Sequence, residues 1–483
     1  MLFNSFEFFV FFPLVVLMYY IIPQKFRWAL LLAASYYFYM AWKAEYIILI
    51  VISTLIDYAA GIQMSKHSEK SKRKPWLILS ICTNLGILMT FKYANFFIDN
   101  INDLLSQLGS TGSIGALKFI LPMGISFYTF QTMAYSVDVY NGKIKHESHL
   151  GYFALYVTYF PQLVAGPIER AENLLHQFRQ KFNFKYDNVV LGLKQMLWGL
   201  FKKVVIADRL AVVVDQIYNS PTESPGIILA LGTYLFAFQI YCDFSGYSDI
   251  AIGASRILGI KLMDNFKTPY FSQSISEFWQ RWHISLSTWF RDYLYIPLGG
   301  NRVAKWKWYR NLIIVFVVSG FWHGANWTFL MWGFLHGAYL IGAIWFGKLN
   351  KSISTVFGIV KNQRIQKWIN IFITFHLAAF AWIFFRANNI EDAFHICKTI
   401  LSLDLDVSEG INFIRDLGYG KTFFSLTLVA FLVLIDSSMD KIHMMKKLNP
   451  ILVKSQYVIY AFVLALLVLA GRFGEVSFIY FQF

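Results

Sequence analysis

Long apolar runs separated by short polar loops extend from one end of the chain to the other. The runs without any charge include residues 8–22, 77–89, 312–318, 426–435 and 457–470. A helix needs roughly 20 mostly apolar residues to cross a bilayer, and many of these runs lie in weakly charged stretches near that length. Counting such stretches predicts about ten to twelve spans. The predicted fold class is therefore all-α, a polytopic membrane protein with further re-entrant or horizontal helices.

Composition supports this prediction and excludes a soluble globular protein. Hydrophobic residues make up 57% of the chain and charged residues 15%, whereas about a quarter of a soluble domain is charged. The net charge of +15 does not indicate nucleic-acid binding, because the basic residues gather in short loops between apolar runs. Such loops lie on the cytoplasmic side of membrane proteins. We place four of them there: residues 66–74, 302–310, 348–367 and 441–447.

The positions of the basic loops predict where the two termini lie. Two apolar stretches, 28–42 and 46–62, separate the basic residues near Lys25 from the loop at 66–74, so both loops lie on one side and the N-terminus on the other. The first apolar run is a span, not a removable signal peptide. One last span follows the loop at 441–447, which places the tail at 473–483 outside. We expect a single membrane domain, 1–483, in a bacterial cytoplasmic (inner) membrane.

Two weakly apolar stretches, 241–256 and 272–295, carry most of the charges that fall within predicted spans, and charged side chains avoid hydrocarbon. The second is predicted to be a tilted or re-entrant helix that lines a polar cavity, because irregular backbone at membrane depth needs protein or water around it. The polar, tunnel-lining region is expected at about 241–340. Asp243 and Asp249 are candidates for cation or proton binding, but an ion pair between Asp249 and Arg256, two helical turns apart, competes with that role.

His323 is the most informative single residue, in the sequence SGFWHGANW. Counted from Asn311, about twelve steps of roughly 1.5 Å place it about 18 Å along a helix, near the middle of a bilayer core of roughly 30 Å. Gly320 and Gly324 allow close approach by substrate or by another helix, and Asn326 is a candidate hydrogen-bond partner. The alternative is a histidine that bonds to a neighbouring helix.

Three further histidines lie in apolar or aromatic surroundings. His283 follows Trp282 in the polar stretch, where the i, i+4 spacing of Glu277 and Arg281 predicts an ion pair. Histidines at membrane interfaces often only reach toward water, so this stretch alone does not define a chemical role. For His336 and His376 the simpler interpretation is packing. No metal site is predicted: the three cysteines have no paired spacing, and no metal-ligand motif occurs.

Several ordered motifs resemble one family closely. FWQRWHISLSTWFRDYLYIPLGGNR and SGFWHGANWTFLMWGFLHG are similar to the bacterial branch of the membrane-bound O-acyltransferases, in particular to alginate and peptidoglycan O-acetylation proteins. YFPQLVAGPIER, YCDFSGYSD, the N-terminal MLFNSFEFFVFF and the closing FIYFQF are also similar to that branch. The resemblance runs nearly from end to end.

The resemblance implies that His323 is the catalytic histidine and that His283 occupies the second position of the family's pair. Trp282, Arg281 and Asn326, neighbours of the two histidines, are candidate substrate-binding residues. Burial in an apolar tunnel favours a neutral imidazole, which can accept a proton from an attacking hydroxyl. His283 would orient the acyl donor or polarise its carbonyl.

The family also implies a set of partners in addition to membrane lipid. The donor is a cytoplasmic acyl thioester, with acetyl-CoA the expected substrate and no bound cofactor. The acceptor is a polysaccharide of the cell envelope or a secreted one, reached through an extracytoplasmic SGNH-type O-acetyltransferase. In the related D-alanylation system a tyrosine in a similar C-terminal motif takes the acyl group in passing, and the matching residue is Tyr480. Otherwise the aromatic tail only anchors the chain.

Two other functions stay open at this stage. Within the family, the alternative is D-alanyl transfer to teichoic acid from a carrier-protein thioester, although the LGGNR and WHGANW forms favour the acetyl branch. From another class, a proton-coupled transporter or flippase would use His323 and the aspartates to move protons or ions. Transporters usually show paired, pseudo-symmetric halves, and no internal repeat is evident here.

Overall fold

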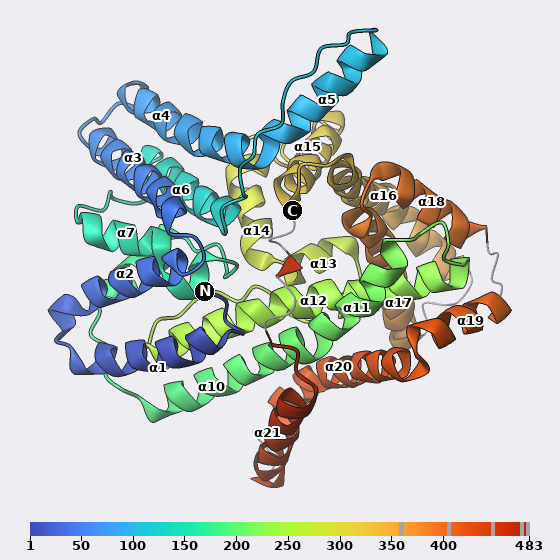
Figure 1. Cartoon of the computed structure of the whole chain (residues 1–483). Coiled ribbons are helices and arrows are strands. Elements are labelled where there is room, and N and C mark those ends of the chain that lie inside the picture. Colours follow the sequence, from blue (N-terminus) through green and yellow to red (C-terminus); the bar gives the residue numbers. More distant parts are fainter. Residues whose placement is uncertain (357–361, 403–406, 446–449, 474–477, 480–483) are drawn as a thin grey trace. The chain divides into compact units, whose positions relative to one another are not determined.

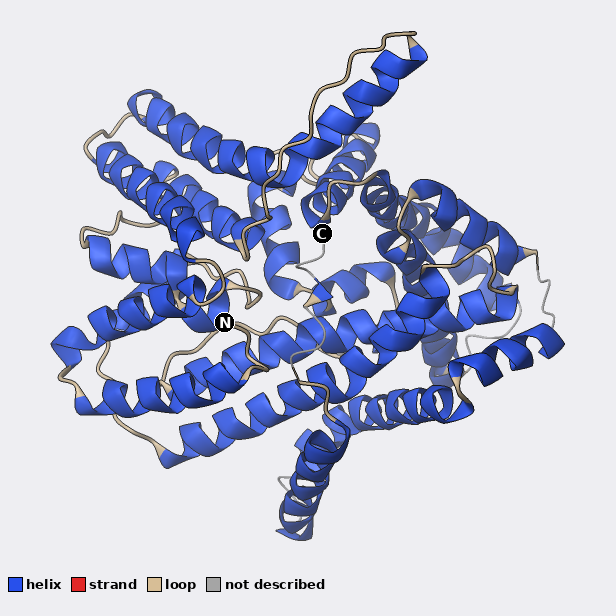
Figure 2. Cartoon of the chain, viewed as in Figure 1, coloured by secondary structure: helices blue, strands red, loops and turns tan. Residues whose placement is uncertain are grey.

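The structure is a computed structural model that describes residues 1–356, 362–402, 407–445, 450–473 and 478–479. In these ranges the chain forms helices, loops and turns, and no strand, as Figure 2 shows. The predicted all-α fold class is confirmed. The described residues form two compact units, Met1–Met196 with Tyr247–Met263, and Leu197–Gly246 with Asp264–Ile479. We call them unit 1 and unit 2 and describe each by itself.

Unit 1 consists of the N-terminal helices. Proline and glycine mark several of their ends: α2 begins after Pro23, and α6 begins after Gly124, whose φ of 71° is in the left-handed region. The elements are α1 (Phe6–Ile21), α2 (Gln24–Met40), η1 (Ala44–Tyr46), α3 (Ile47–Ser65), α4 (Lys70–Leu88), η2 (Met89–Tyr93), α5 (Ala94–Gln107), α6 (Ile125–Tyr140), α7 (Leu150–Thr158), α8 (Phe160–Leu163), α9 (Ala171–Leu174), η3 (Leu175–Arg179) and α10 (Tyr186–Leu200), whose last turn belongs to unit 2.

Helices α3, α4 and α6 lie side by side in unit 1 (Figure 1). Their shared interface contains Asp57, which is fully buried together with hydroxyl and amide side chains of the other two helices. Gly61, on the same helix, allows the close packing, because a Cβ there would lie 2.8 Å from the hydroxyl of Tyr135. The interface of these three apolar helices therefore has a polar centre.

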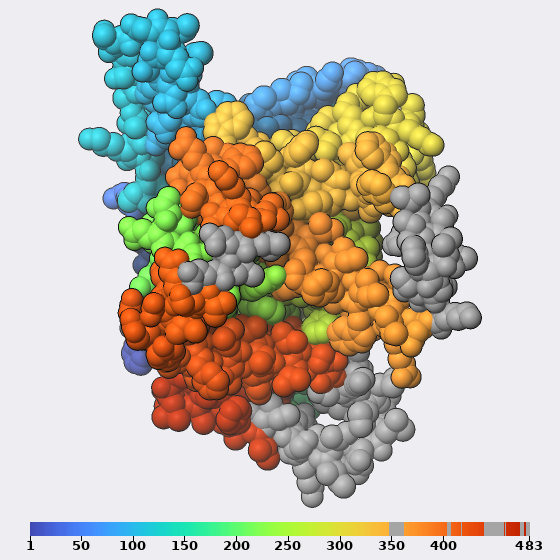
Figure 3. All heavy atoms as spheres, turned by 90° about the vertical axis from the view of Figure 1, so that its right-hand side faces the viewer, coloured from blue at the N-terminus to red at the C-terminus, as the bar shows by residue number. Residues whose placement is uncertain are grey.

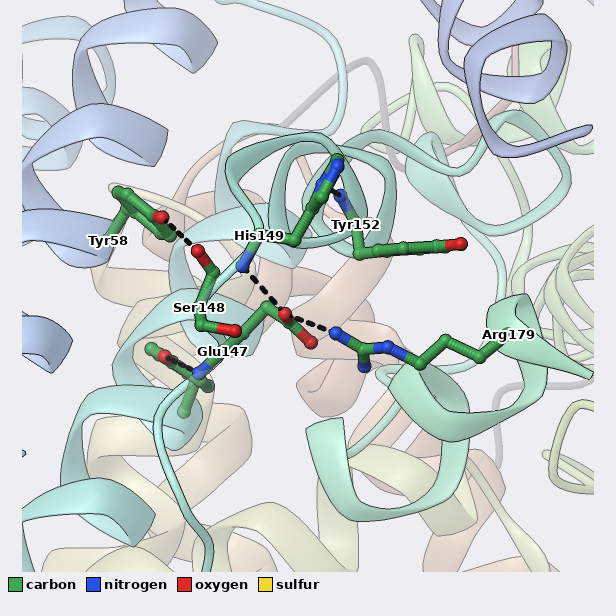
Figure 4. Close-up of polar contacts among 7 residues, drawn as sticks. Tyr58, Glu147, Ser148, His149, Tyr152 and Arg179 are labelled. Carbon is green, nitrogen blue, oxygen red and sulfur yellow. Dashed lines mark hydrogen bonds and ion pairs between the residues drawn. The ribbon is translucent and has the colours of Figure 1, made fainter. Parts of the chain in front are cut away.

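The loop between α6 and α7 is fixed by polar contacts to other parts of unit 1 (Figure 4). The buried carboxylate of Glu147 accepts the backbone N–H of His149 at 2.8 Å and pairs with Arg179. The hydroxyl of Tyr58 on α3 donates to the carbonyl of Ser148 at 2.6 Å. Glu147 and Ser148 are thus held by η3 and α3, and Glu147 in turn holds His149.

Unit 2 contains the remaining helices, and Figure 3 faces its side formed by α17, α18 and α20. Here the polar stretch that follows α12 forms short helices instead of a span. The elements are η4 (Phe201–Ala207), α11 (Asp208–Tyr218), α12 (Gly226–Ile257, shared with unit 1 from Tyr247), η5 (Pro269–Phe271), α13 (Ile275–Arg281), α14 (Ile284–Phe290), η6 (Arg291–Tyr295), α15 (Lys305–His323), α16 (Trp327–Val356), α17 (Gln363–Arg386), α18 (Ile390–Leu401), α19 (Val407–Leu417), α20 (Tyr419–Met445) and α21 (Pro450–Ala470).

Six helices among the described residues are long and apolar enough to cross a membrane, and α1 and Tyr460–Ala470 are shorter apolar helices. This is fewer than the ten to twelve apolar stretches counted in the sequence. Some of those stretches form helices too short to cross alone, such as α7 with 9 residues. Others begin within a basic loop, as α15 does at Lys305. The chain is a multi-pass membrane protein. Of the basic loops, 446–447 lie outside the described residues, as do 357–361.

Candidate active site

His283 lies at a break between two short helices, α13 and α14. The sequence predicted one tilted or re-entrant helix over 272–295, and the structure corrects this, because the helix stops at Arg281 and restarts at Ile284. The backbone of His283 is left-handed, with φ of 42°. That conformation costs a non-glycine residue of order 1 kcal/mol or more and persists only where surrounding contacts impose it. Beyond η6 the chain turns at Gly299 and Gly300, both of which have positive φ.

Asn265 holds both the backbone and the ring of His283. Its carbonyl accepts the N–H of Ile284 at 2.9 Å, and its side-chain Oδ1 accepts the N–H of Ser285 at 3.2 Å. The same Oδ1 lies 3.2 Å from Nδ1 of His283. A backbone N–H identifies this atom as the amide oxygen, which only accepts, so the contact is a hydrogen bond in the tautomer that has its proton on Nδ1; the hydroxyl of Ser285 also lies 3.4 Å from Nδ1. The lone pair of the neutral ring is then on Nε2.

His323 is the last residue of α15. The sequence predicted its depth along a helix that begins near Asn311, and in the structure this helix ends at His323, where Gly324 is extended with φ of −164° and ψ of 151°. α16 starts at Trp327 and packs back along α15. Gly320 makes this close contact possible, because a Cβ there would lie 2.1 Å from the carbonyl oxygen of Phe329. Of the two uses predicted for this glycine, approach by another segment of the chain is confirmed.

The structure brings the two histidines together from segments 40 positions apart, with ring centroids 6.5 Å from each other. Both are buried, with exposed fractions of 0% for His283 and 2% for His323. Aromatic rings form most of the surrounding wall. Those nearest to one or both imidazoles are Phe244, Phe266, Trp322, Trp332 and Phe385.

The wall continues to a third histidine and to a pocket. His336 accepts the indole N–H of Trp279 at 3.3 Å and packs against Trp332, with ring centroids 4.9 Å apart. This arrangement agrees with the packing role predicted for it. Trp279 also borders an apolar pocket of about 160 Å³ that reaches Ser319, one turn before His323, and has Arg291 as its charged lining residue.

The other predicted site residues have three different surroundings in the structure. Trp282 is 1% exposed and packs on Trp382 with ring centroids 5.0 Å apart. Arg281 forms the predicted ion pair with Glu277 at 2.6 Å. Asn326, predicted as a partner of His323, instead accepts the N–H of Thr328 and so caps the start of α16. Tyr480 lies outside the described residues.

Sequence reasoning missed several buried polar contacts of unit 2. Asn265 has no motif of its own, and the histidine it holds is 18 residues later, so only the folded loop reveals the contact. Lys203 was visible as a lysine inside the apolar sequence GLFKKVVIA, which is a signal for buried polar contacts. Asp243 was seen, but not its partner: Lys203 lies 2.5 Å from its carboxylate.

The structure thus shows a multi-pass helical membrane protein with a buried histidine pair enclosed by aromatic rings. Residues 31–386 match the model of MBOAT, the membrane-bound O-acyltransferase family. The chain belongs to this family and is an acyltransferase.

Individual relatives agree with this assignment. The chain is 39% identical to the probable alginate O-acetylase AlgI of Pseudomonas aeruginosa over 404 residues, covering 83% of this chain and 75% of that protein. It is 37% identical to the peptidoglycan O-acetyltransferase of Helicobacter pylori over 400 residues, or 77% and 73% of the two chains. The teichoic acid D-alanyltransferase of Bacillus subtilis is more distant, with 29% identity over 275 residues, or 54% and 68%.

Proposed function

We propose that this acyltransferase moves an acetyl group from a cytoplasmic thioester, acetyl-CoA, across the membrane for O-acetylation of an envelope or secreted polysaccharide. The observation that carries the proposal is the buried histidine pair, with its two ring centroids 6.5 Å apart. The alginate and peptidoglycan O-acetylating relatives support the choice of acetyl group and of acceptor class. An extracytoplasmic SGNH-type transferase would pass the group to the polysaccharide.

His323 acts as the general base in this proposal. Its imidazole takes the proton from an acceptor hydroxyl while that oxygen attacks the thioester carbonyl carbon. The carbon–sulfur bond then breaks, and the proton passes to the leaving thiolate, so the products are an ester and a free thiol. The aromatic walls exclude water, which would otherwise compete for the acetyl group.

The tautomer of His283 narrows its role. With the proton on Nδ1 toward Asn265, the neutral ring presents a lone pair at Nε2. A lone pair does not polarise a carbonyl oxygen, so of the two roles expected from the family we favour orientation of the donor. A thioester donor that carries amide N–H groups, as acetyl-CoA does, can donate a hydrogen bond to Nε2.

Tyr480 serves as the acyl relay in this proposal, on the extracytoplasmic side. Splitting the transfer into two ester-forming steps keeps the bulky polysaccharide out of the bilayer. The loop charges support this side for the tail. A cysteine at Ser71, in the loop at 66–74, should then react only with membrane-permeant thiol reagents.

D-alanyl transfer is the second candidate within the family. The acetylating relatives match more of this chain and at higher identity, 39% over 83% of it against 29% over 54%. We therefore favour acetyl transfer. The purified protein is supplied with either acetyl-CoA or a D-alanyl carrier-protein thioester. The acyl group that it transfers distinguishes the two candidates.

The relay is tested with Tyr480→Phe, which keeps the ring and deletes the hydroxyl. In cells that carry the variant, envelope acetate should fall about 100-fold or more, as for a lost nucleophile, at a normal level of membrane protein. His323→Ala should give the same loss. Wild-type acetate in Tyr480→Phe would show that the tail does not carry the acetyl group, and wild-type acetate in His323→Ala would refute the catalytic assignment.

A further inference from the structure

Three buried charges in unit 2 lie against one another at the junction of η4, α11 and α12. The ammonium group of Lys203 is 2.7 Å from Oδ1 of Asp208 and 2.5 Å from Oδ1 of Asp243. All three residues are at most 3% exposed. Charges buried in this way are costly, and such groups add little net stability compared with apolar residues of the same size. Their presence therefore calls for a purpose other than stability.

The second oxygen of Asp243 holds the C-terminal tail. Oδ2 accepts the backbone N–H of Ile479 at 2.8 Å. Ile479 and its neighbour Phe478 are 4% and 1% exposed, so the contact is shielded from water. A hydrogen bond to an ionised acceptor in such surroundings is stronger than one between neutral groups. The lysine fixes the carboxylate, and the carboxylate fixes the tail.

The same part of unit 2 also holds the chain where it leaves α21. The side chain of Arg209 donates to the carbonyl of Ala470, the last residue of α21, at 2.7 Å. The backbone N–H of Arg472 donates to the carbonyl of Val204 at 3.1 Å. The residues just before the tail are therefore bonded to η4 and α11, and Ile479 is bonded to α12.

The anchored tail lies next to the histidine site. Phe244 follows Asp243 on α12, and its ring centroid is 5.7 Å from that of Phe478 and 4.6 Å from that of His283. The ring of Phe244 thus packs against both Phe478 and one member of the histidine pair. The residue after the anchored Ile479 is Tyr480, the proposed relay.

We propose that Lys203 and Asp243 are positioning residues for acyl transfer: they anchor the N–H of Ile479, the residue that directly precedes the proposed relay Tyr480. This inference rests on the proposed relay. Neither residue touches the reacting atoms. Their contribution is orientation, and a misplacement of about 1 Å can cost an enzyme on the order of 100-fold in rate.

Amide hydrogen exchange in the purified full-length protein tests the anchor directly. In wild type the amide of Ile479 should exchange slowly, and Asp243→Ala should speed exchange in the C-terminal peptide at least about ten-fold, because the acceptor is gone. Asp243→Ala leaves Lys203 paired with Asp208, so no unpaired buried cation results. The matched control is Asp249→Asn on the same helix, whose side chain contacts Gln195 at 3.2 Å and should leave the tail protected. Unchanged exchange in Asp243→Ala would overturn the anchor.

Kinetics with acetyl-CoA then test positioning. Ile479→Pro removes the N–H that Asp243 accepts, and it also changes the side chain and fixes φ at this position. Transfer of acetyl to the envelope acceptor should fall about 10- to 100-fold in kcat, with the KM for the thioester unchanged. Ile479→Ala trims the side chain but keeps the N–H, and should restore near wild-type transfer.

The possible results separate the inference from the proposed function. Full transfer by Ile479→Pro, or by Asp243→Ala with a freely exchanging tail, would overturn the positioning role and leave the contact purely structural. A wild-type protein that transfers no acetyl group would refute the proposed function. In that case the exchange measurement alone upholds or overturns the anchor.

Discussion

Each unit contains a cluster of buried polar side chains, and the two clusters differ in their hydrogen-bond partners and in the regularity of their backbone. In unit 1, Asp57 accepts hydrogen bonds from Ser80 at 2.5 Å and from Asn84 at 2.8 and 3.0 Å. The amide oxygen of Asn84 in turn accepts from Ser53 at 2.7 Å and from Thr132 at 3.0 Å. These hydrogen bonds join polar side chains of α3, α4 and α6. All three helices are regular at the contacts.

The histidine pair of unit 2 is enclosed mainly by aromatic rings, and its backbone is irregular. His283 is left-handed between two short helices, and His323 ends its helix. A saturated network such as that around Asp57 fixes helices against one another and has little capacity to bind a substrate. Strained backbone of the kind seen at His283 clusters at functional sites. We therefore expect changes in unit 1 to affect stability, and changes at the pair to affect turnover.

The largest expected effect is that of His323→Ala, which removes the general base. Turnover of acetyl-CoA into transferred acetyl should fall about 100-fold or more, while the thermal unfolding midpoint in detergent stays within a few degrees of wild type. The matched control is His376→Ala on α17, whose ring bonds to the carbonyl of Phe372 within its own helix. Equal losses of turnover in His323→Ala and His376→Ala would contradict the expectation that the histidine pair governs turnover.

Asn265→Ala should come next. It removes the acceptor that fixes the ring and tautomer of His283, so kcat should fall about 10- to 100-fold through loss of orientation. Asn265→Asp keeps an acceptor at this place and should recover part of the rate. Steady-state kinetics of both variants provide the measurement. An Asn265→Ala enzyme with a wild-type kcat would mean that the left-handed backbone alone orients His283.

Gly333→Ala should lower stability and turnover together, because it separates α15 and α16. A Cβ at this position would lie 2.2 Å from the carbonyl oxygen of Phe316, and overpacking of this kind costs about 1–3 kcal/mol. Gly342→Ala on the same helix has no atom within 4 Å of the new Cβ and should be neutral or slightly stabilising. Comparing the thermal unfolding midpoints of Gly333→Ala and Gly342→Ala distinguishes the effect of close helix packing from the effect of helix propensity.

The smallest effect on turnover is expected from Asp57→Leu. Removing the shared acceptor leaves Ser80 only its contact with Ser136 and the amide nitrogen of Asn84 only its bond to the carbonyl of Ser80, at a cost of about 1–3 kcal/mol in the free energy of unfolding. The rate per folded molecule should stay near wild type. Asp57→Asn, which keeps an acceptor, should lose less stability. A ten-fold loss of kcat in folded Asp57→Leu would show that the network takes part in transfer.

The pattern of residues close together in the sequence predicted the fold class, one candidate site residue and one ion pair. Apolar run length is a property of contiguous residues, and it indicated an all-α membrane protein, because only helices satisfy their own backbone within such a run. The same reading indicated His323, since an imidazole in an apolar run stands out. It also predicted the ion pair of Glu277 and Arg281, whose spacing alone brings the two side chains together.

Tertiary structure decided what depends on residues far apart in the chain. The break at His283 follows from Asn265, which bonds to the backbone on the far side of the break; the run of residues around His283 carries no helix breaker of its own. Asn326 became a helix cap because α15 ends at His323, which the apolar pattern through that point does not reveal. The contact of Asp243 with Ile479 joins residues 236 positions apart. Local propensity carries no information on such pairs, because they form only when packing brings distant helices together.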